Sequence, residues 1–378
     1  MHVPGETKDQ IVVWVEKTRV LMAGDNIYSC FPNIYAVRGT PPRSSVEWAE
    51  AVRTMRSLQP EHLVFSHGLP VSGSERVHDL LTTYMSGIYY VHDQTVRLIN
   101  RGLHPDEIAR QIRLPPTLAS HPFLKECYGM TGWSAKGVYE EYVGWFSGDP
   151  VELQPLTPRQ RAEHMVRLVG ERKLVSEARE ALDQQDWQWA LELSTMILRV
   201  EPDSDAAKEI RVEALRNLAG DQINPSARNF YMTAALDDVG LVDWKVDQSK
   251  IIDNVDMLVL INLMRFKLKA DDVDGVNLTT VIHFTDTRER YRLRILYSVL
   301  DVEVLPATAE DEEKMTEEER RKEEEEEGAF HLRLETTSGV WREIVARKRS
   351  PTMALATGDI TVEGSLLKFK AFLSYFQE

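Results

Sequence analysis

Three short apolar runs in the first part of the chain predict buried β-strands. They are residues 11–15, 20–23 and 63–65, and glycine or proline stands near them. Short apolar runs with such neighbours are typical of strands inside a sheet. Before the third run, Ser44 and Glu47 have the spacing of a helix capping box. Apolar residues at helical spacing then predict a helix that packs on the sheet: Trp48, Val52, Met55 and Leu58.

Helical periodicity replaces the strand pattern between about residues 72 and 220. Gly102 ends one predicted helix and Pro105 begins the next, as is typical of helix boundaries. An aromatic-rich stretch at residues 128–146 is typical of a helical core, and also of a large helix-mediated homodimer interface. Residues 157–220 predict helical hairpins similar to one tetratricopeptide pair, which we interpret as part of the same helical domain. The first helix has one apolar stripe: Leu80, Tyr84, Ile88 and Val91.

The last part of the chain predicts a mixture of strands and helices. A helix is expected at residues 227–236. The expected strands are at residues 266–268, 278–284, 291–304, 330–334 and 360–362, of which 291–304 is expected to be one strand because its apolar residues alternate. The acidic run at residues 310–327 is interpreted as a solvated insertion without chemistry, bounded by residues 309 and 328. A final amphipathic helix has one apolar side: Leu366, Phe369, Phe372, Leu373 and Phe376.

Charge and cysteine content narrow the classes of partner. The formal net charge of the 378-residue chain is −15, which argues against nucleic acid and anionic membrane surfaces as partners. No apolar stretch approaches the length of a membrane span. Cys30 and Cys127 have neither a disulfide-framework nor a zinc-finger pattern, so they are expected to be free thiols. Free thiols favour an intracellular, cytoplasmic chain.

Three polar side chains stand close to the ends of the predicted strands or beside a glycine. Glu6 follows a glycine, Asp25 follows Gly24 at the end of the second run, and His67 follows the third run. Glycine lets the backbone approach closely and take unusual dihedral angles. Carboxylate and imidazole groups at one edge of a sheet suit zinc, iron or manganese. Taken singly, each residue fits an ordinary turn or a structural histidine better than a metal site.

The order of these motifs resembles a known family. The sequences Pro-Gly-Glu-Thr, Ala-Gly-Asp-Asn, Val-Arg-Gly and Phe-Ser-His-Gly resemble the second half of a metallo-β-lactamase-type domain, and more closely its alkylsulfatase branch. The resemblance implies that Glu6, Asp25 and His67 are zinc ligands, with Asp25 bridging two metals. It implies that Arg38 binds the sulfate group. An aspartate stands where bacterial relatives often have glutamate, which leaves the metal spacing open.

The later parts of the chain extend this resemblance. The sequences His-Asp-Gln-Thr at residues 92–95 and Gly-Trp-Phe at residues 144–146 resemble the helical dimerisation domain of alkylsulfatases, and residues 358–376 resemble a sterol-carrier-protein-like domain. The implied fold class is a mixed α/β multidomain protein. Its expected domains are a partial αββα sandwich at 1–71, an all-α dimerisation domain at 72–222, and an α+β sterol-carrier-protein-like domain at 223–378. The implied partners are a second copy of the chain and an alkyl sulfate or lipid-like ligand.

One element of the family pattern is missing from the sequence. The superfamily has an upstream His-x-His-x-Asp-His motif, whereas the ten histidines here are scattered. We therefore expect a fragment or shortened isoform that carries about half of a two-metal site. Two alternatives to alkyl sulfate hydrolysis stay open, a non-catalytic dimerising and lipid-binding protein and a metal-dependent hydrolase of another ester. His92 is a weaker candidate for a catalytic base, and Arg43 is interpreted either as part of an anion pocket or as a solvated loop residue.

Overall fold

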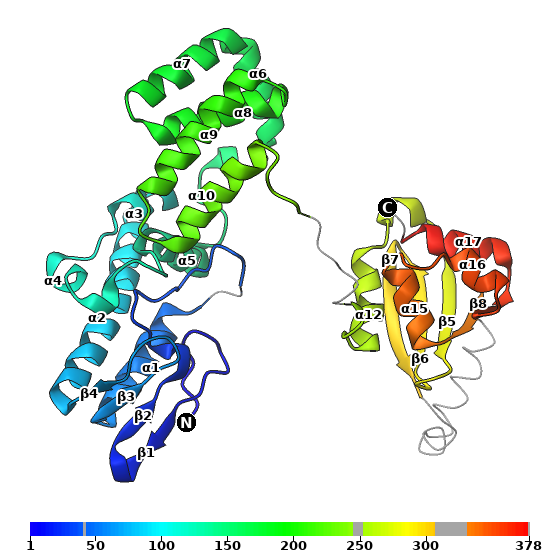
Figure 1. Cartoon of the computed structure of the whole chain (residues 1–378), viewed down its shortest axis with the longest axis horizontal. Coiled ribbons are helices and arrows are strands. Elements are labelled where there is room, and N and C mark those ends of the chain that lie inside the picture. Colours follow the sequence, from blue (N-terminus) through cyan, green and yellow to red (C-terminus); the bar gives the residue numbers. More distant parts are fainter. Residues whose placement is uncertain (41–42, 245–251, 307–330, 377–378) are drawn as a thin grey trace. The chain divides into compact units, whose positions relative to one another are not determined.

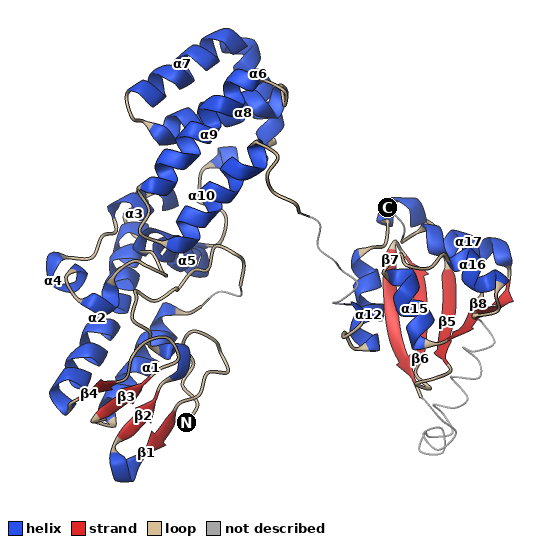
Figure 2. Cartoon of the chain, viewed as in Figure 1, coloured by secondary structure: helices blue, strands red, loops and turns tan. Residues whose placement is uncertain are grey.

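The computed structural model describes residues 1–40, 43–244, 252–306 and 331–376. The chain divides into two compact units, Met1–Asp243 and Trp244–Glu378, which Figures 1 and 2 show by position in the sequence and by secondary structure. The first unit contains a small sheet and many helices, and the second contains a larger sheet with helices. The expected mixed α/β multidomain fold is therefore confirmed. The acidic run expected at 309–328 lies outside the described residues.

The first unit begins with a four-stranded sheet in the order β1-β2-β3-β4. Strands β2 and β3 are parallel, and the two outer pairings are antiparallel. Leu21 and Leu63 are register partners at the centre of the sheet, and both are fully buried. Each of the three predicted runs therefore contains or overlaps a strand, but β1 is not buried as expected, because Val13 and Val15 are exposed. The strands are β1 (Val13–Val15), β2 (Val20–Met22), β3 (His62–Val64) and β4 (Val71–Ser72).

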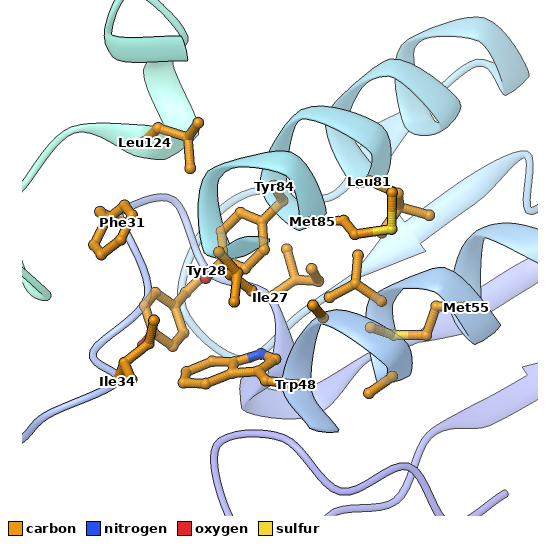
Figure 3. Close-up of a cluster of buried hydrophobic side chains, with 14 of the residues drawn as sticks. Ile27, Tyr28, Phe31, Ile34, Trp48, Met55, Leu81, Tyr84, Met85 and Leu124 are labelled. Carbon is orange, nitrogen blue, oxygen red and sulfur yellow. The ribbon is translucent and has the colours of Figure 1, made fainter. Parts of the chain in front are cut away.

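Two long helices share one core with this sheet. Helix α1 (Ser45–Ser57) begins where the Ser44 side chain accepts a hydrogen bond from the Glu47 backbone nitrogen. Helix α2 (Ser74–Ile99) packs against α1 and buries the predicted apolar stripe. Figure 3 shows the centre of the core, where aromatic rings from a loop and from both helices meet edge to face: Tyr28, Trp48 and Tyr84. Large buried aromatic side chains contribute strongly to such a core.

The same core continues beyond the expected boundary between residues 71 and 72. It includes residues of α3 (Pro105–Gln111) and α5 (Thr131–Val143), and partly buried residues of the short α4 (Pro116–Ala119). The sheet and these helices are therefore not separated by a break in packing. Short 3₁₀ turns complete this region: η1 (Glu16–Thr18), η2 (Gly24–Asn26), η3 (Pro122–Leu124) and η4 (Pro150–Glu152).

The remaining helices of the first unit form a separate small core. Helices α6, α7, α8 and α9 pack as hairpins, as the sequence predicts. Helix α10 packs against α9, and the first compact unit extends to Asp243. The bounds are α6 (Pro158–Val169), α7 (Glu171–Asp183), α8 (Trp187–Val200), α9 (Asp205–Gly220) and α10 (Pro225–Asp238).

The two cysteines form a disulfide, so the free-thiol prediction was wrong. Cys30 lies in the loop after η2 and Cys127 in the loop before α5, 97 residues apart in sequence. Two backbone hydrogen bonds flank the disulfide, from the Phe31 nitrogen to the Lys125 oxygen (2.8 Å) and from the Gly129 nitrogen to the Phe31 oxygen (3.0 Å). This long-range pairing has no signature in cysteine spacing. The intracellular interpretation therefore loses the support of free thiols.

The second unit is built on a five-stranded sheet in the order β7-β6-β5-β8-β9. Strands β5 and β8 are parallel and the other pairs are antiparallel. Helix α15 lies across the sheet in Figure 1, and its Trp341 meets Phe284 of β5 edge to face. The strands are β5 (Leu278–Phe284), β6 (Arg290–Leu296), β7 (Val299–Leu305), β8 (Leu332–Thr336) and β9 (Ile360–Gly364), and the helices are α12 (Met257–Leu263), η5 (Met264–Phe266), η6 (Ala270–Val273), α15 (Ser338–Val345), α16 (Pro351–Ala356) and α17 (Leu366–Ser374).

Two strand predictions in this unit were wrong. The expected single strand at 291–304 is a hairpin of β6 and β7, because Tyr297 and Ser298 both have left-handed backbone angles that reverse the chain. The turn contains no glycine or asparagine to announce it. Residues 266–268 do not form the expected strand. Phe266 is instead the last residue of η5, and its side chain is exposed. In the described part of the chain, no helix is both long and apolar enough to cross a bilayer.

We expect the disulfide to contribute measurably to the stability of the first unit. Replacing both Cys30 and Cys127 by serine removes a cross-link over a long loop, and the free energy of unfolding is expected to fall by about 2–4 kcal/mol. Urea denaturation followed by tryptophan fluorescence measures this loss. A reducing agent should lower the stability of the natural chain to a similar extent and leave the double variant unchanged. Equal stability of the two proteins without reductant would contradict the assignment.

Candidate functional site

The parallel pair β2 and β3 brings Asp25 and His67 together. Backbone hydrogen bonds continue this pairing past the strand ends, from the Ala23 nitrogen to the Val64 oxygen (2.7 Å) and from the Ser66 nitrogen to the Gly24 oxygen (3.2 Å). Parallel strands deliver their carboxyl ends to the same edge of a sheet. As a result, His67 Nε2 lies 3.4 Å from Asp25 Oδ1. Two of the three predicted ligands are therefore neighbours.

The two side chains differ in how accessible they are. The His67 side chain is 73% exposed, and that of Asp25 is 37% exposed. Within the described structure, the Asp25 Oδ1 atom is nonetheless buried and makes no hydrogen bond. A buried carboxylate oxygen without a hydrogen-bond partner is unfavourable. The arrangement leaves an acceptor beside an accessible imidazole, which is suited to a cation that approaches from solvent.

Glu6 is held next to this pair by Asn26. The Glu6 backbone nitrogen donates to Asn26 Oδ1 at 3.1 Å, and Asn26 Nδ2 donates to the Val3 oxygen at 2.8 Å. A Cβ atom on Gly5 would lie 2.1 Å from Asn26 Oδ1, so only glycine fits before Glu6. Asn26 is fully buried. The asparagine after Asp25 therefore fixes the glutamate loop against the end of β2.

The Glu6 carboxylate faces a buried arginine. Arg43 Nη1 lies 2.8 Å from Glu6 Oε1 and donates a second hydrogen bond to the Asn33 oxygen, also at 2.8 Å. The two side chains are only 9% and 10% exposed. Burial raises the pKa of Glu6, the Arg43 charge opposes that rise, and the neighbouring Asp25 carboxylate adds to it. The interpretation of Arg43 as a solvated loop residue was wrong, and its guanidinium is engaged with a carboxylate and not with an open anion pocket.

Arg38 lies on the same loop and is exposed. Its Nη2 donates to the Tyr128 hydroxyl at 2.9 Å, and its guanidinium carbon lies 5.8 Å from the centre of that ring. This hydrogen bond is the main cause that raises the pKa of Arg38, and the charge of Glu6 adds a smaller contribution. Arg38 is therefore a fixed cation within electrostatic reach of the carboxylates, held by an aromatic residue of the helical part.

His92 does not offer a free nitrogen. Its Nδ1 lies 2.8 Å from Asp93 Oδ1 and its Nε2 lies 2.9 Å from the Tyr142 hydroxyl. The imidazole side chain is 13% exposed. These contacts join helices α2 and α5, so they favour a packing role over that of a catalytic base.

The three predicted ligands do not form a complete metal site in the described structure. Among residues 1–40, 43–244, 252–306 and 331–376, no group of three or more histidine, cysteine or acidic side chains is placed to hold a metal ion. Asp25 and His67 fit a cation by position and donor type. The Glu6 carboxylate instead forms an ion pair with Arg43. The assignment of all three as metal ligands stays a prediction.

Sequence reasoning missed two residues that organise the site. Asn26 belongs to the Gly-Asp-Asn sequence. Its position directly after Asp25 was the only sequence feature that indicated a role in the site. Tyr128 was noted only as part of an aromatic stretch, and its contact with Arg38 spans 90 residues. The pairing of Arg43 with Glu6 also joins distant segments. These contacts depend on tertiary packing that local periodicity does not encode.

Comparisons with known proteins cover most of the chain. The family model for alkyl sulfatase dimerisation matches residues 104–238, and that for the alkyl sulfatase C-terminal domain matches residues 245–378. The solved structure of the stereoselective inverting sec-alkylsulfatase Pisa1 from Pseudomonas sp. superposes with a TM-score of 0.83 at 22% identity, over 100% of this chain and 58% of that one. This likeness shows a shared fold.

Sequence relatives give the family. A linear primary-alkylsulfatase from a Pseudomonas strain is 31% identical over 391 residues, covering 100% of this chain and 70% of that protein. A second linear primary-alkylsulfatase from Pseudomonas is 27% identical, over 99% of this chain and 54% of that protein. The chain thus spans 70% of the length of the first relative and 54% of the length of the second. The expected resemblance is confirmed, and the chain belongs to the alkylsulfatase family.

Proposed function

We propose that this chain serves the hydrolysis of alkyl sulfate esters to an alcohol and inorganic sulfate. The observation that carries the proposal is the buried Asp25 Oδ1, which makes no hydrogen bond, 3.4 Å from Nε2 of the accessible His67; the exposed Arg38 follows in the same unit. The relatives' names support the choice of ester. An exposed arginine suits an anionic ester better than a neutral one.

Asp25 and His67 are the residues proposed to hold a divalent cation, with Glu6 as a further ligand. Zinc is the proposed metal because imidazole and carboxylate are common zinc ligands. Such a cation supplies Lewis acidity and lowers the pKa of water. The sequence contains no His-x-His-x-Asp-His run, so the ligands which that motif supplies in the family pattern are not among these residues. The proposal therefore concerns this chain's share of the site.

Arg38 is proposed to bind the sulfate group. A planar guanidinium donates two parallel hydrogen bonds to an oxyanion. One nitrogen of Arg38 is already used by the Tyr128 hydroxyl, which fixes the plane of the guanidinium and leaves other donors on an exposed side chain. Tyr128 is therefore a positioning residue for Arg38. Holding the guanidinium in place lowers the entropy that binding would otherwise cost.

The second candidate is a non-catalytic dimerising protein. It is favoured by the lack of a three-ligand metal group among the described residues. We further propose that the chain forms a homodimer, as the matched dimerisation family suggests. Exposed apolar side chains cluster in sequence at the end of α5 and after it: Tyr142, Trp145, Val151, Leu153 and Leu156. Contiguous exposed apolar residues often mark protein interfaces.

The proposed function is tested by metal binding and sulfate release together. The natural chain, loaded with zinc, is expected to bind the metal and release sulfate from dodecyl sulfate. Asp25→Asn removes the charge of the unpartnered carboxylate and should weaken zinc binding at least about tenfold, as loss of a charged ligand commonly does. Equilibrium dialysis and sulfate release are the measurements. Zinc binding without turnover would favour the non-catalytic candidate, and equal binding by both proteins would exclude Asp25 as a ligand.

The role of Arg38 has a matched control in the same unit. Arg38→Gln is expected to weaken the binding of inorganic sulfate about tenfold or more, because it removes a charge-assisted hydrogen-bond donor worth about 1.5–3 kcal/mol. Isothermal titration calorimetry measures the change. Arg53 donates to the Tyr89 hydroxyl at 3.1 Å and lies 5.5 Å from that ring, so it has the same type of aromatic contact at another place, where it is also paired with Glu50 at 3.2 Å. Arg53→Gln should leave sulfate binding unchanged, and an equal loss in both variants would contradict the assignment.

The homodimer prediction is tested on the exposed apolar segment. Trp145 is 73% exposed and Leu153 is 59% exposed. Replacing both by serine should raise the dimer dissociation constant at least about tenfold, since aromatic anchors dominate many interfaces. Light scattering after size exclusion measures the mass. Phe266→Ser, at an apolar residue of the second unit that is even more exposed, should leave the mass unchanged. A dimer that survives the first change would place the interface elsewhere.

A further inference from the structure

Asn224, which is fully buried, makes more contacts than the start of a helix requires. Its Oδ1 atom accepts a hydrogen bond from the Ala227 backbone nitrogen at 3.1 Å, which caps helix α10. Serine, threonine or aspartate would cap a helix in the same way through one oxygen. The amide nitrogen has a separate use, because it donates to the backbone oxygen of Tyr128 at 2.8 Å and to that of Glu126 at 3.3 Å. Asn224 therefore joins the start of α10 to a loop that is distant in the sequence.

The loop that Asn224 holds is the one that carries Tyr128. Residues 125–130 join η3 to α5 and contain no helix or strand. Alternate residues of this loop bind residues 30–31 through two backbone hydrogen bonds and the disulfide. The carbonyl groups of the two residues between them, one of which is Tyr128, bind Asn224 instead. Asn224 therefore acts directly on the backbone of Tyr128, whereas these other contacts act on its neighbours.

The side chain of Tyr128 connects this loop to Arg38. Its ring meets the buried Tyr28 ring edge to face, with 5.3 Å between the ring centres. Its hydroxyl accepts the hydrogen bond from Arg38 Nη2, and the Arg38 guanidinium carbon lies 5.8 Å from the ring centre. Arg38 is exposed, and holding a long exposed side chain in one rotamer costs entropy. The position of the Tyr128 backbone therefore decides where the guanidinium is held.

We propose that Asn224 is a positioning residue for sulfate binding, which acts on Arg38 through Tyr128. The inference rests on the proposed role of Arg38 and extends it to the start of helix α10. Because Oδ1 is engaged by the first turn of α10, the amide group of Asn224 is fixed and its nitrogen is directed at the loop. An arginine that is held in place before the anion arrives loses less entropy when it binds.

The test replaces Asn224 by serine and measures the binding of inorganic sulfate by isothermal titration calorimetry, with the ionic strength held constant by chloride. Serine keeps an oxygen that caps α10 but has no amide nitrogen to reach the loop. Aspartate is avoided, because a new negative charge would itself weaken anion binding. The dissociation constant for sulfate is expected to rise about fivefold, because Arg38 is no longer held in place before binding.

Further variants separate positioning from a general loss of stability. Thr157→Ala removes the side-chain cap of helix α6 in the same unit and should lower the melting temperature while sulfate affinity stays unchanged. Tyr128→Phe removes the hydroxyl that Arg38 uses, so adding Asn224→Ser to it should weaken sulfate binding by less than about twofold more. Tryptophan fluorescence checks that each variant is folded, and Asn224→Thr, with another capping hydroxyl, replaces the serine variant if that one does not fold.

The outcomes distinguish the inference from the proposed function beneath it. If Arg38→Gln weakens sulfate binding but Asn224→Ser does not, the inference is overturned while the role of Arg38 stands. If Asn224→Ser has the same effect in the natural chain and in Tyr128→Phe, Asn224 acts by another route and the inference is also overturned. If the natural chain binds no sulfate, or Arg38→Gln binds it equally well, the role of Arg38 fails and the inference fails with it. A loss in Asn224→Ser that disappears in the Tyr128→Phe background supports the inference.

Discussion

Parallel pairing of β2 with β3 is the constraint on which the rest of the site depends. A parallel pair needs a crossover connection, and helix α1 supplies it between the two strands. The crossover returns the chain so that the segment after each strand leaves the sheet at one edge. Asp25 and His67, separated by the whole length of the crossover, therefore come within 3.4 Å of each other. Loss of this register by one residue would place one of them on the other face.

Buried polar atoms around the strand ends extend this constraint to the rest of the unit. The Trp48 Nε1 atom of helix α1 donates to the Asn26 oxygen at 2.9 Å, while the Asn26 side chain bonds the loop that carries Glu6. Asn26 is fully buried, so each of these hydrogen bonds offsets a cost of burial. The helix that covers the sheet and the loop that carries the carboxylate are thus tied to the residue directly after Asp25. The same residues therefore both pack the core and position the site.

Local pattern predicted the elements well and their long-range contacts poorly. The apolar stripe of α2 is periodic in sequence and is buried as predicted, and the apolar runs of β2 and β3 each place one fully buried leucine in the sheet, Leu21 and Leu63. The hairpin of β6 and β7 was missed because Tyr297 and Ser298 adopt left-handed angles without a glycine or asparagine. The disulfide of Cys30 with Cys127 was missed because its geometry exists only after the loops meet across the core. Residue type and position at strand ends were enough to name candidate ligands. They were not enough to predict which side chain each candidate contacts in the folded chain.

Arg38 and Arg43 show why residue type alone does not decide function. They lie five positions apart on one loop and have the same charge. Arg43 precedes the helix cap and is turned inward, where burial makes an uncompensated charge costly and Glu6 satisfies it. Arg38 is exposed and rests on Tyr128, where its remaining donors stay available to an anion from solvent. The same guanidinium therefore completes the protein's own charge balance at one position and is free to recognise a ligand at the other, and the difference comes from burial and not from sequence.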